Sequence, residues 1–565
     1  MDGGRRRWAR VDIAEKVAAF CAASQNQTSQ RAFTEEIQVP RSTLQDWLAK
    51  RDRIDADEEV IQFFENPIGV AFLHRIVIAS HVVTGLLGAS GVRFVCAFLE
   101  LSGLAPFVAT SFGAQQRVRV VLEKATVEFG KEEGQRLGQQ MTPKEIAVCE
   151  DETFHPQPCL VAIDPVSNFI LLESYASDRK AETWSSHLKE AIAGLPVRIV
   201  QSTSDEGKGI LRHVREDLGI HHSPDVFHVQ RDCYKATSGP LATRRRQAEE
   251  ALQKASKAIC QQQVQREEDR SARSEAALPC QVGLNPCTDN TVKNEIEARE
   301  RYEAAKALEE RAKKAIQSIS TVYHPYDLET GAPKTATDLE SALQKSFLEI
   351  EEVAKEAGLK EGCLKRIQKA RRVLAAMVAT LSFYWTTVTA KVKALSLPSE
   401  VEAAVFSILI PGLYLKAAAK KATTSDRKRM LLQKASELLS MLFFGTNGGP
   451  LCCLKGEQLA LVLQVAKECA DLFQRSSSCV EGRNGRLSLQ HHGFHHLSDR
   501  KLGALTIVHN YYIKRDDGTT AAERFFGAKP KDLFEFLLTN VDLPGRPAKK
   551  RSQTKSEVDR VPLPV

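Results

Sequence analysis

Three acidic residues stand where they could act together on a phosphodiester bond. Asp151 and Asp205 each end a short apolar run, and Glu481 lies in a polar segment much farther along the chain. Three carboxylates brought together repel one another unless cations lie between them, and hard oxygen ligands favour Mg²⁺ or Mn²⁺. Two such ions about 3.5–4 Å apart activate a water or a 3′-hydroxyl and stabilise the leaving oxygen. The expected chemistry is metal-dependent cleavage or transfer of a phosphodiester.

The segment from residue 144 to 229 has the strands and helices needed to position the first two acids. Apolar or alternating runs, separated by proline, serine and asparagine, predict sequential antiparallel strands at 145–154, 158–164 and 168–176. After them we expect a helix at 179–193, a strand at 197–203, a helix at 206–218 and a strand at 225–229. This order is that of an RNase H-like α/β domain. Its first and fourth strands are neighbours, so Asp151 and Asp205 would meet.

The acids beside these two residues leave an alternative open. Glu150 and Glu152 flank Asp151, and strand alternation places them on the opposite face of the sheet. Periodicity therefore does not choose which face carries the site. Glu206, beside Asp205, is more simply explained as an acid in the first turn of the next helix, where it complements the helix dipole.

Several motifs, in this order along the chain, resemble those of the DDE transposases of bacterial insertion sequences, within the RNase H-like and retroviral-integrase superfamily. They are CEDETF with CLVAIDPVSNFILLE behind it, STSDEGKGI, DVFHVQRD and RSSSCVEGRNGRLSLQHHG, within residues 144–235 and 470–527. The resemblance implies that Asp151, Asp205 and Glu481 are the catalytic and metal-binding acids, and it favours Asp151 over its neighbours. It implies two Mg²⁺ or Mn²⁺ ions per active site and double-stranded DNA, as element ends and target, for a substrate.

Polar residues around the final acid are candidate supports. Asn484 is three residues after Glu481 and therefore on the same helical face, where it would orient the carboxylate or contact a phosphate. Arg483 and Arg486 are expected to contact DNA. The alternatives are a polar surface residue for Asn484 and a solvated face for the two arginines.

A histidine near the fifth strand is a further candidate. The run Asp225-Val-Phe-His228 resembles the Asp/Cys-x-x-His signature of DDE families that carry an all-helical insertion before the final glutamate. By that resemblance His228 would support the metal-binding acids or contact DNA. A hydrogen-bonded histidine at a strand end is the alternative.

The N-terminal region predicts a helix-turn-helix. Short helices are expected at 12–23, 28–37 and 41–51, with residues 38–40 as the bend. Leu44, Trp47 and Leu48 would form the packed side of the third helix. The candidate DNA-binding residues are Arg41, Ser42, Thr43, Gln45, Lys50 and Arg51. A three-helix cap without DNA contact is the alternative.

The remaining sequence suggests how the chain is divided. The expected parts are a helix-turn-helix module at 1–55, a helical linker at 56–140, the first part of an RNase H-like domain at 141–235, an all-helical insertion at 236–470, the second part of that domain at 471–540 and a disordered basic tail at 541–565. Charged, proline-free stretches at 243–277 and 291–318 predict a long antiparallel helical hairpin in the insertion. A second α/β-like element is expected from Gly456 to Leu489.

Two further features keep more than one interpretation. Trp385 lies in the aromatic run of the insertion, where it would stack on a DNA base or belong to the core. His491, His492, His495 and His496 have helical spacing for zinc, but Gly493 interrupts the helix and no acid or cysteine partner is nearby.

Composition limits the class of protein. The chain has 565 residues, 43% of them hydrophobic and 26% charged, with 78 basic and 71 acidic side chains. These values are typical of a globular chain with several domains and exclude a fibrous or disulfide-dense secreted protein. The charged N-terminus indicates no export signal, and the apolar segment 76–92 is too short and too polar for a membrane span, so it predicts a buried helix.

We therefore expect a cytoplasmic, nucleoid-associated DNA transposase that forms a homo-oligomer around two DNA ends and has no membrane partner. The same sequence features are compatible with two other functions. One is a catalytically silent relative that regulates by binding DNA, and the other is an RNase H-like nuclease without strand transfer.

Overall fold

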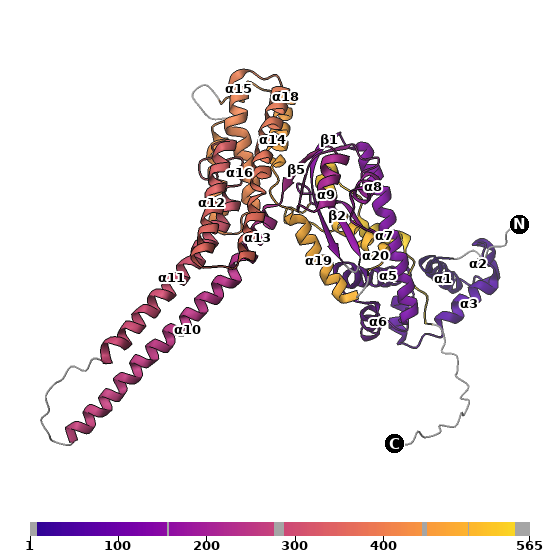
Figure 1. Ribbon diagram of the computed structural model, residues 1–565. Helices are drawn as coiled ribbons and strands as arrows, with labels where there is room; N and C mark the ends of the chain where they lie inside the picture. The colour runs from indigo at the N-terminus through magenta and orange to yellow at the C-terminus, as the bar shows by residue number, and fades with distance from the viewer. Residues whose placement is uncertain (1–7, 155–156, 276–286, 443–448, 495–496, 548–565) are drawn as a thin grey trace.

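The computed structural model of the protein describes residues 8–154, 157–275, 287–442, 449–494 and 497–547. Figure 1 shows an α/β body surrounded by helices from both ends of the chain, beside a helical region from which one long hairpin extends. The α/β body carries the candidate acids. The helical region is inserted between its strands and its last helices.

The N-terminal helices form a small cluster of their own, close to the predicted positions. They are α1 (Arg10–Gln25), α2 (Gln30–Glu36) and α3 (Arg41–Arg51). Their shared core consists of the buried side chains Val17, Phe20, Phe33, Val39, Leu44 and Trp47. The polar side of α3 is thereby left at the surface.

A run of helices connects this cluster to the sheet. It consists of α4 (Glu58–Phe64), α5 (Pro67–His81), the short π-helix η1 (Val82–Leu87), α6 (Val92–Leu101) and α7 (Phe112–Gln140). The apolar segment predicted at 76–92 falls on α5 and η1, where Val77, Ile78, Val82 and Leu86 are buried in the protein. The long helix α7 packs against the last helices of the chain.

The sheet is mixed, with the strand order β3-β2-β1-β4-β5. Its strands are β1 (Lys144–Phe154), β2 (Pro158–Asp164), β3 (Phe169–Tyr175), β4 (Val197–Ser204) and β5 (His221–Pro224). β1 is antiparallel to β2 and parallel to β4, and β2 is antiparallel to β3. The predicted antiparallel run and the pairing of the first and fourth strands are confirmed. Helices cover both faces, and β2 is therefore buried over almost its whole length.

The fifth strand is not at the predicted place. Residues 225–229 are the start of the long helix α10 (Val226–Glu275), and the strand ends at Pro224. Asp225 stops the strand because its carboxylate accepts the backbone N–H of Phe227 at 2.8 Å, which satisfies one of the free donors at the helix start. Val226 and Val229 are three residues apart on the buried side of this helix, a spacing that suits a helix as well as an apolar run.

The helices between the strands agree better with the prediction. α8 (Ala181–Ala191) lies within the expected helix, and the next one is divided into α9 (Lys208–Arg212) and the π-helix η2 (His213–Asp217). Both lie against the sheet, since α8 packs against β3 and η2 against β5.

Apart from an isolated β-bridge between Tyr326 and Pro333, the regular elements of the described insertion are helices. α10 and α11 (Cys287–Val322) form the antiparallel hairpin that the sequence predicts, and Figure 1 shows it extending far from the rest of the protein. The other helices are α12 (Ala336–Glu356), α13 (Glu361–Arg371), α14 (Leu374–Lys393), α15 (Ser399–Ala404), the π-helix η3 (Val405–Leu409), α16 (Ile410–Lys420), α17 (Ser425–Ser440) and α18 (Gly456–Leu472).

The predicted α/β-like element at 456–489 is wrong. α18 and α19 (Ser478–Phe494) occupy this segment, and within its described residues no strand is present. The buried residues Val462, Ala466, Cys469 and Ala470 have helical spacing and join the core of the insertion. The chain then returns to the α/β body through α20 (Asp499–Tyr511), α21 (Ala521–Phe526) and α22 (Leu533–Asn540).

The beginning of the expected disordered tail is fixed to the protein. The carbonyl of Gly545 accepts the N–H of Ala109 at 2.9 Å. Arg546 forms an ion pair with Glu65, which Arg10 also contacts at 2.9 Å. The rest of the predicted tail, residues 548–565, lies outside the described residues.

Within the described residues, three helical segments are long and apolar enough to cross a membrane: Pro67–Leu87, Glu361–Lys393 and Ser399–Lys420, with mean hydropathy of 1.7, 1.5 and 1.5. Each of them supplies side chains to the protein's own cores, such as Leu73, Leu381 and Leu415. The buried shares of the three apolar windows are 50%, 39% and 50%.

Candidate functional site

β1 and β4 bring two of the acids to the same edge of the sheet. The strands are parallel neighbours, and Glu150 pairs with Ser204. Asp151 and Asp205 each come one residue later, so both lie at the carboxyl ends of adjacent strands. Their carboxylates accept backbone N–H groups, Asp151 from Glu152 at 2.8 Å and Asp205 from Gly207 at 2.9 Å.

The third acid comes from α19, which packs across β1 and β2. Glu481 lies in the first turn of this helix. One turn later, the amide of Asn484 donates to Asp151 Oδ2 at 3.2 Å. Asn484 was expected to orient the carboxylate of Glu481, but its hydrogen bond is to Asp151. This contact places the first turns of α19 beside the strand-end acids.

The start of α10 holds a second group of residues against Glu481. His228 Nδ1 is 2.7 Å from Asp225 Oδ2, and its Nε2 lies 3.6 Å from Glu481 Oε1. Arg231 Nη1 is 3.8 Å from the same oxygen of Glu481. Arg231 was not among the residues predicted from the sequence, because the helix was expected to begin farther along. Once α10 starts at Val226, the spacing of three residues puts His228 and Arg231 on one side of the helix.

The negative charges of the three acids are not fully balanced by the cations around them. Burial raises the pKa of Asp151 to about 7, and the charges of Asp205 and Glu481 add to this effect. Burial works against the charged forms of Asp225 and His228 as well. Their hydrogen bond nevertheless keeps the pKa of Asp225 below its usual value and raises the pKa of His228. This pair is therefore held as an ion pair beside the acids.

The donor chemistry of Asp151, Asp205 and Glu481 fits a hard divalent cation, because all three ligands are carboxylates and the charge on Asp151 is poorly compensated. Within the described parts of the chain, however, no three His, Cys, Asp or Glu side chains stand close enough together to enclose a metal ion. The acids lie in the right region, but their side chains do not form a closed coordination shell.

The acids that flank Asp151 point to the other face of the sheet. Glu150 is fully buried, accepts the hydroxyl of Ser202 and lies 3.5 Å from His213 Nε2. Glu152 accepts the indole N–H of Trp184 at 3.2 Å. Both acids are engaged by α8, β4 and η2, so Asp151 is the member of the run that faces α19.

The structure corrects the expected role of Arg483. Its side chain is 4% exposed and forms a two-pronged ion pair with Glu173 of β3, with Nε at 2.7 Å from Oε1. A guanidinium buried in this pair cannot reach DNA. Arg486 is exposed on the same helix, as its predicted contact requires. Glu173 has no sequence motif that would have paired it with Arg483.

The predicted DNA-binding residues of α3 lie together at the surface. Arg41, Ser42, Gln45 and Lys50 are exposed, and Thr43 and Arg51 are partly buried. Two of these cations are engaged, because Lys50 pairs with Asp46 at 2.5 Å and Arg51 lies 3.6 Å from Glu58. The surface is polar and continuous along one side of the helix.

Trp385 belongs to an aromatic cluster of the insertion. Its indole N–H donates to the carbonyl of Lys334 at 3.0 Å, and its ring lies 5.4 Å from that of Tyr326. This agrees with the core interpretation. In the histidine cluster, His491 lies 3.3 Å from the hydroxyl of Tyr175, while residues 495–496 lie outside the described parts of the chain.

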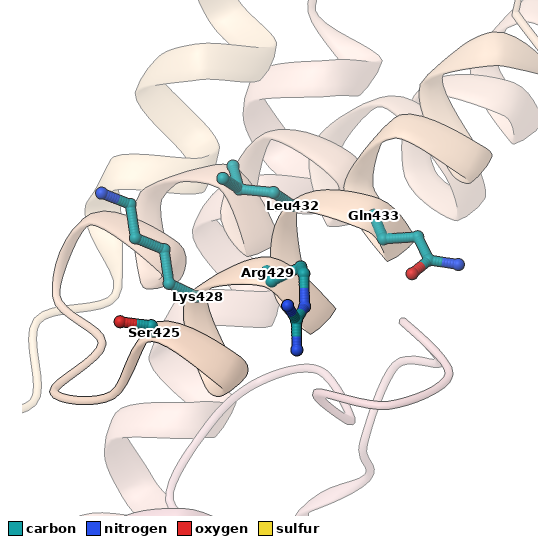
Figure 2. Close-up of a pocket in the computed structure, with 5 residues that line it drawn as sticks. All are labelled: Ser425, Lys428, Arg429, Leu432 and Gln433. Atoms are coloured by element: carbon teal, nitrogen blue, oxygen red, sulfur yellow. The ribbon is translucent and has the colours of Figure 1, made fainter.

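One open hollow lies on the insertion and not at the acids. It is lined by residues of α17, namely Ser425, Lys428, Arg429, Leu432 and Gln433 (Figure 2). None of the three candidate acids takes part in its lining. Its polar residues are hydroxyl, cationic and amide groups.

One protein family matches the C-terminal part of the chain. Residues 405–553 match DUF6399, a family of unknown function. This region contains Glu481, Asn484 and the whole of α19. No curated protein and no solved structure matches the chain.

Proposed function

We propose that this protein is a DDE-type DNA transposase with an RNase H-like catalytic domain. It would cleave DNA at the ends of a mobile element and transfer the 3′-hydroxyl ends to target DNA. The observation that carries the proposal is the convergence of Asp151, Asp205 and Glu481 from β1, β4 and α19 on one edge of a mixed sheet. The strand order β3-β2-β1-β4-β5 supports the fold assignment.

Asp151, Asp205 and Glu481 would hold the two Mg²⁺ or Mn²⁺ ions, which when bound supply the Lewis acidity for in-line attack on a phosphodiester. The protein's other residues position these ligands. Asn484 holds Asp151 by its amide, and His228, itself fixed by Asp225, lies against Glu481 together with Arg231. Because Arg231 is 41% exposed, its guanidinium is also accessible to a phosphate oxygen.

The exposed polar side of α3 would bind the element ends. Two ends must be held at once for joining, which requires a homo-oligomer. The protein would act in the cytoplasm, on the nucleoid.

The test is a cell-based excision and integration assay that uses the gene's own flanking DNA as donor ends. Asp205→Asn should reduce joining by on the order of a thousandfold, the scale of losing a main group that stabilises the transition state. DNA binding in a gel-shift assay should remain. Glu206→Gln is the matched control, because Glu206 is the exposed neighbouring acid and should retain activity.

The other outcomes identify the alternatives. Binding to the flanks without any excision by the wild type would indicate a DNA-binding regulator. Acid-dependent cuts that are never joined would indicate a nuclease. Full activity of Asp205→Asn would show that the site is assigned wrongly.

A further inference from the structure

The end of α16, the start of α17 and the turn between them carry many cations at one end of the insertion. These cations, here called the basic end, are Lys416, Lys420, Lys421, Arg427, Lys428 and Arg429. All are exposed except Arg427, which is partly buried. Asp426 is the acid within this stretch, and it pairs with Arg429 at 2.7 Å. The other members form no ion pair with a carboxylate in the described part of the chain.

Many cations elsewhere in the insertion are paired with glutamates. Along the hairpin and the helices beside it, cations are matched with glutamates: Arg245 with Glu309, Arg299 with Glu295, Arg301 with Glu297, Arg311 with Glu356, Lys313 with Glu309 and Lys365 with Glu361. Most of these pairs span one helical turn, which is typical of a solvated helix face. Exposed cations with no carboxylate partner among the described residues also occur along α13 and directly after it, namely Arg366, Lys369 and Arg372, so the basic end is distinguished by its place beside the segment that leads to α19.

The positive charge at this end of the insertion affects the pKa of the buried residue His324. Burial holds the pKa of His324 well below its ordinary value, and the charges of Arg475, Lys334, Arg427 and Lys421 lower it further. Cations from the loop after α11, from the α16–α17 turn and from the segment before α19 therefore meet at one end of the insertion. An uncompensated positive region of this kind attracts polyanions.

The basic end adjoins the chain segment that leads to the candidate acids. Lys421 Nζ donates to the side chain of Gln474 at 3.3 Å. The carbonyl of Arg475 accepts the backbone N–H of Val226, the first residue of α10, at 2.9 Å. Gln474 and Arg475 thus connect the turn to α10 on one side and to α19 with Glu481 on the other.

Figure 2 shows how the basic end meets solvent. Lys428 and Arg429 leave the first turns of α17 in different directions beside the open hollow, with Ser425 at the helix start. Lysine ammonium and arginine guanidinium groups bind phosphate oxygens, and a surface without a deep pocket suits an extended backbone better than a small anion.

We propose that the basic end binds the phosphate backbone of duplex DNA next to the bond that is cut. This rests on the proposed function, since it assigns a second contact surface to the same DNA substrate. The insertion would then hold the DNA on the side of α19 opposite to α3. It would contribute affinity without sequence preference, because phosphate contacts position a duplex and base contacts specify it.

The test compares two triple variants of the full-length protein that change net charge equally. The test variant is Lys416→Gln, Lys420→Gln and Lys428→Gln, three exposed cations that form no ion pair within the described residues, and it leaves Lys421 and Arg427 with their neighbours. The control is Lys313→Gln, Lys365→Gln and Arg301→Gln, a set of cations that are already paired with glutamates. Binding to a labelled duplex of about 40 base pairs is measured by fluorescence anisotropy between about 50 and 200 mM KCl, the range in which phosphate contacts dominate affinity.

The test variant should bind about tenfold or more weakly at ~100 mM KCl, and its slope of log K against log salt should fall by about 2 to 3, or ~0.9 for each lost contact. The control should bind like the wild type. Equal behaviour of the two variants would overturn the proposal and leave the proposed function standing. A changed slope together with an absence of DNA cleavage would retain the DNA surface and remove the transposase assignment, whereas a wild type that binds no DNA would overturn both.

Discussion

The α/β body and the helical insertion bury different kinds of side chains. The sheet contains Glu150, Ser202, Thr203 and Ser204 at 0% exposure, and His213 beside them is equally buried. The insertion instead has an apolar and aromatic core, and its many ion pairs lie on helix surfaces. Buried polar groups require partners in fixed positions. The α/β body therefore adds buried polar side chains, such as Ser202 hydrogen-bonded to Glu150, to an apolar core, whereas the core of the insertion is mainly apolar and aromatic.

A buried and an exposed ion pair give the largest expected contrast between the two regions. Arg483→Met would leave Glu173 buried without its counter-charge, and we expect the free energy of unfolding to fall by about 3–5 kcal/mol. In the insertion, Arg371→Met removes a partner of Glu351 from a half-exposed pair, and the loss should not exceed about 1 kcal/mol. Urea unfolding followed by circular dichroism measures both.

The double variant Glu173→Gln with Arg483→Met checks the cause. It should recover part of the stability, because no unpaired charge remains buried. Similar losses for Arg483→Met and Arg371→Met would abolish the distinction between the regions.

Acid should weaken the protein through histidines packed around the sheet. Burial lowers the pKa of His81 and of His509 to about 4, while an unfolded chain has a histidine pKa near 6.5. Between these values the unfolded state binds more protons, so stability is lost as the pH falls from about 6.5 toward 4. At pH 5 each histidine should lower the free energy of unfolding by about 2 kcal/mol relative to neutral pH.

The variant His81→Gln sharpens this prediction, because glutamine retains a polar side chain near Gln115 but does not titrate. Its thermal midpoint should decline less than that of the wild type between pH 7 and pH 5. An unchanged decline would mean that His81 is already protonated in the folded protein or contributes nothing to acid sensitivity.

Helix caps should show the smallest difference, because their effect is local in either region. Thr335 forms a capping box with Asp338 at the start of α12 in the insertion, and Ser498 caps α20 in the α/β body. Alanine at either position should lower the free energy of unfolding by about 1 kcal/mol. A much larger loss for Ser498→Ala, seen by the same urea titration, would show that the α/β body amplifies even local defects.

Apolar runs between turn residues predicted the strands, and charged, proline-free stretches predicted the hairpin. The first four strands, the N-terminal helices and the hairpin lie close to the expected positions. The start of α10 was missed because Val226 and Val229 suit a strand or a helix, and only the backbone contact of Asp225 decides between them.

The candidate site was predictable in part for a similar reason. The three acids and Asn484 could be named from spacing and resemblance, and the structure brings Asn484 to Asp151. Arg483 could not be interpreted correctly, since its partner Glu173 lies 310 residues away in sequence. Arg231 needed the correct helix start before its spacing had a meaning.

The order of translation determines when the two ion pairs at Glu65 can form. Glu65 contacts Arg10 at the beginning of α1 and Arg546 after the last helix. Arg10 and Glu65 are translated before the sheet, whereas Arg546 follows the acids and the whole insertion in the chain. The ion pair between Arg546 and Glu65 can therefore form only after the acids and the insertion have been translated.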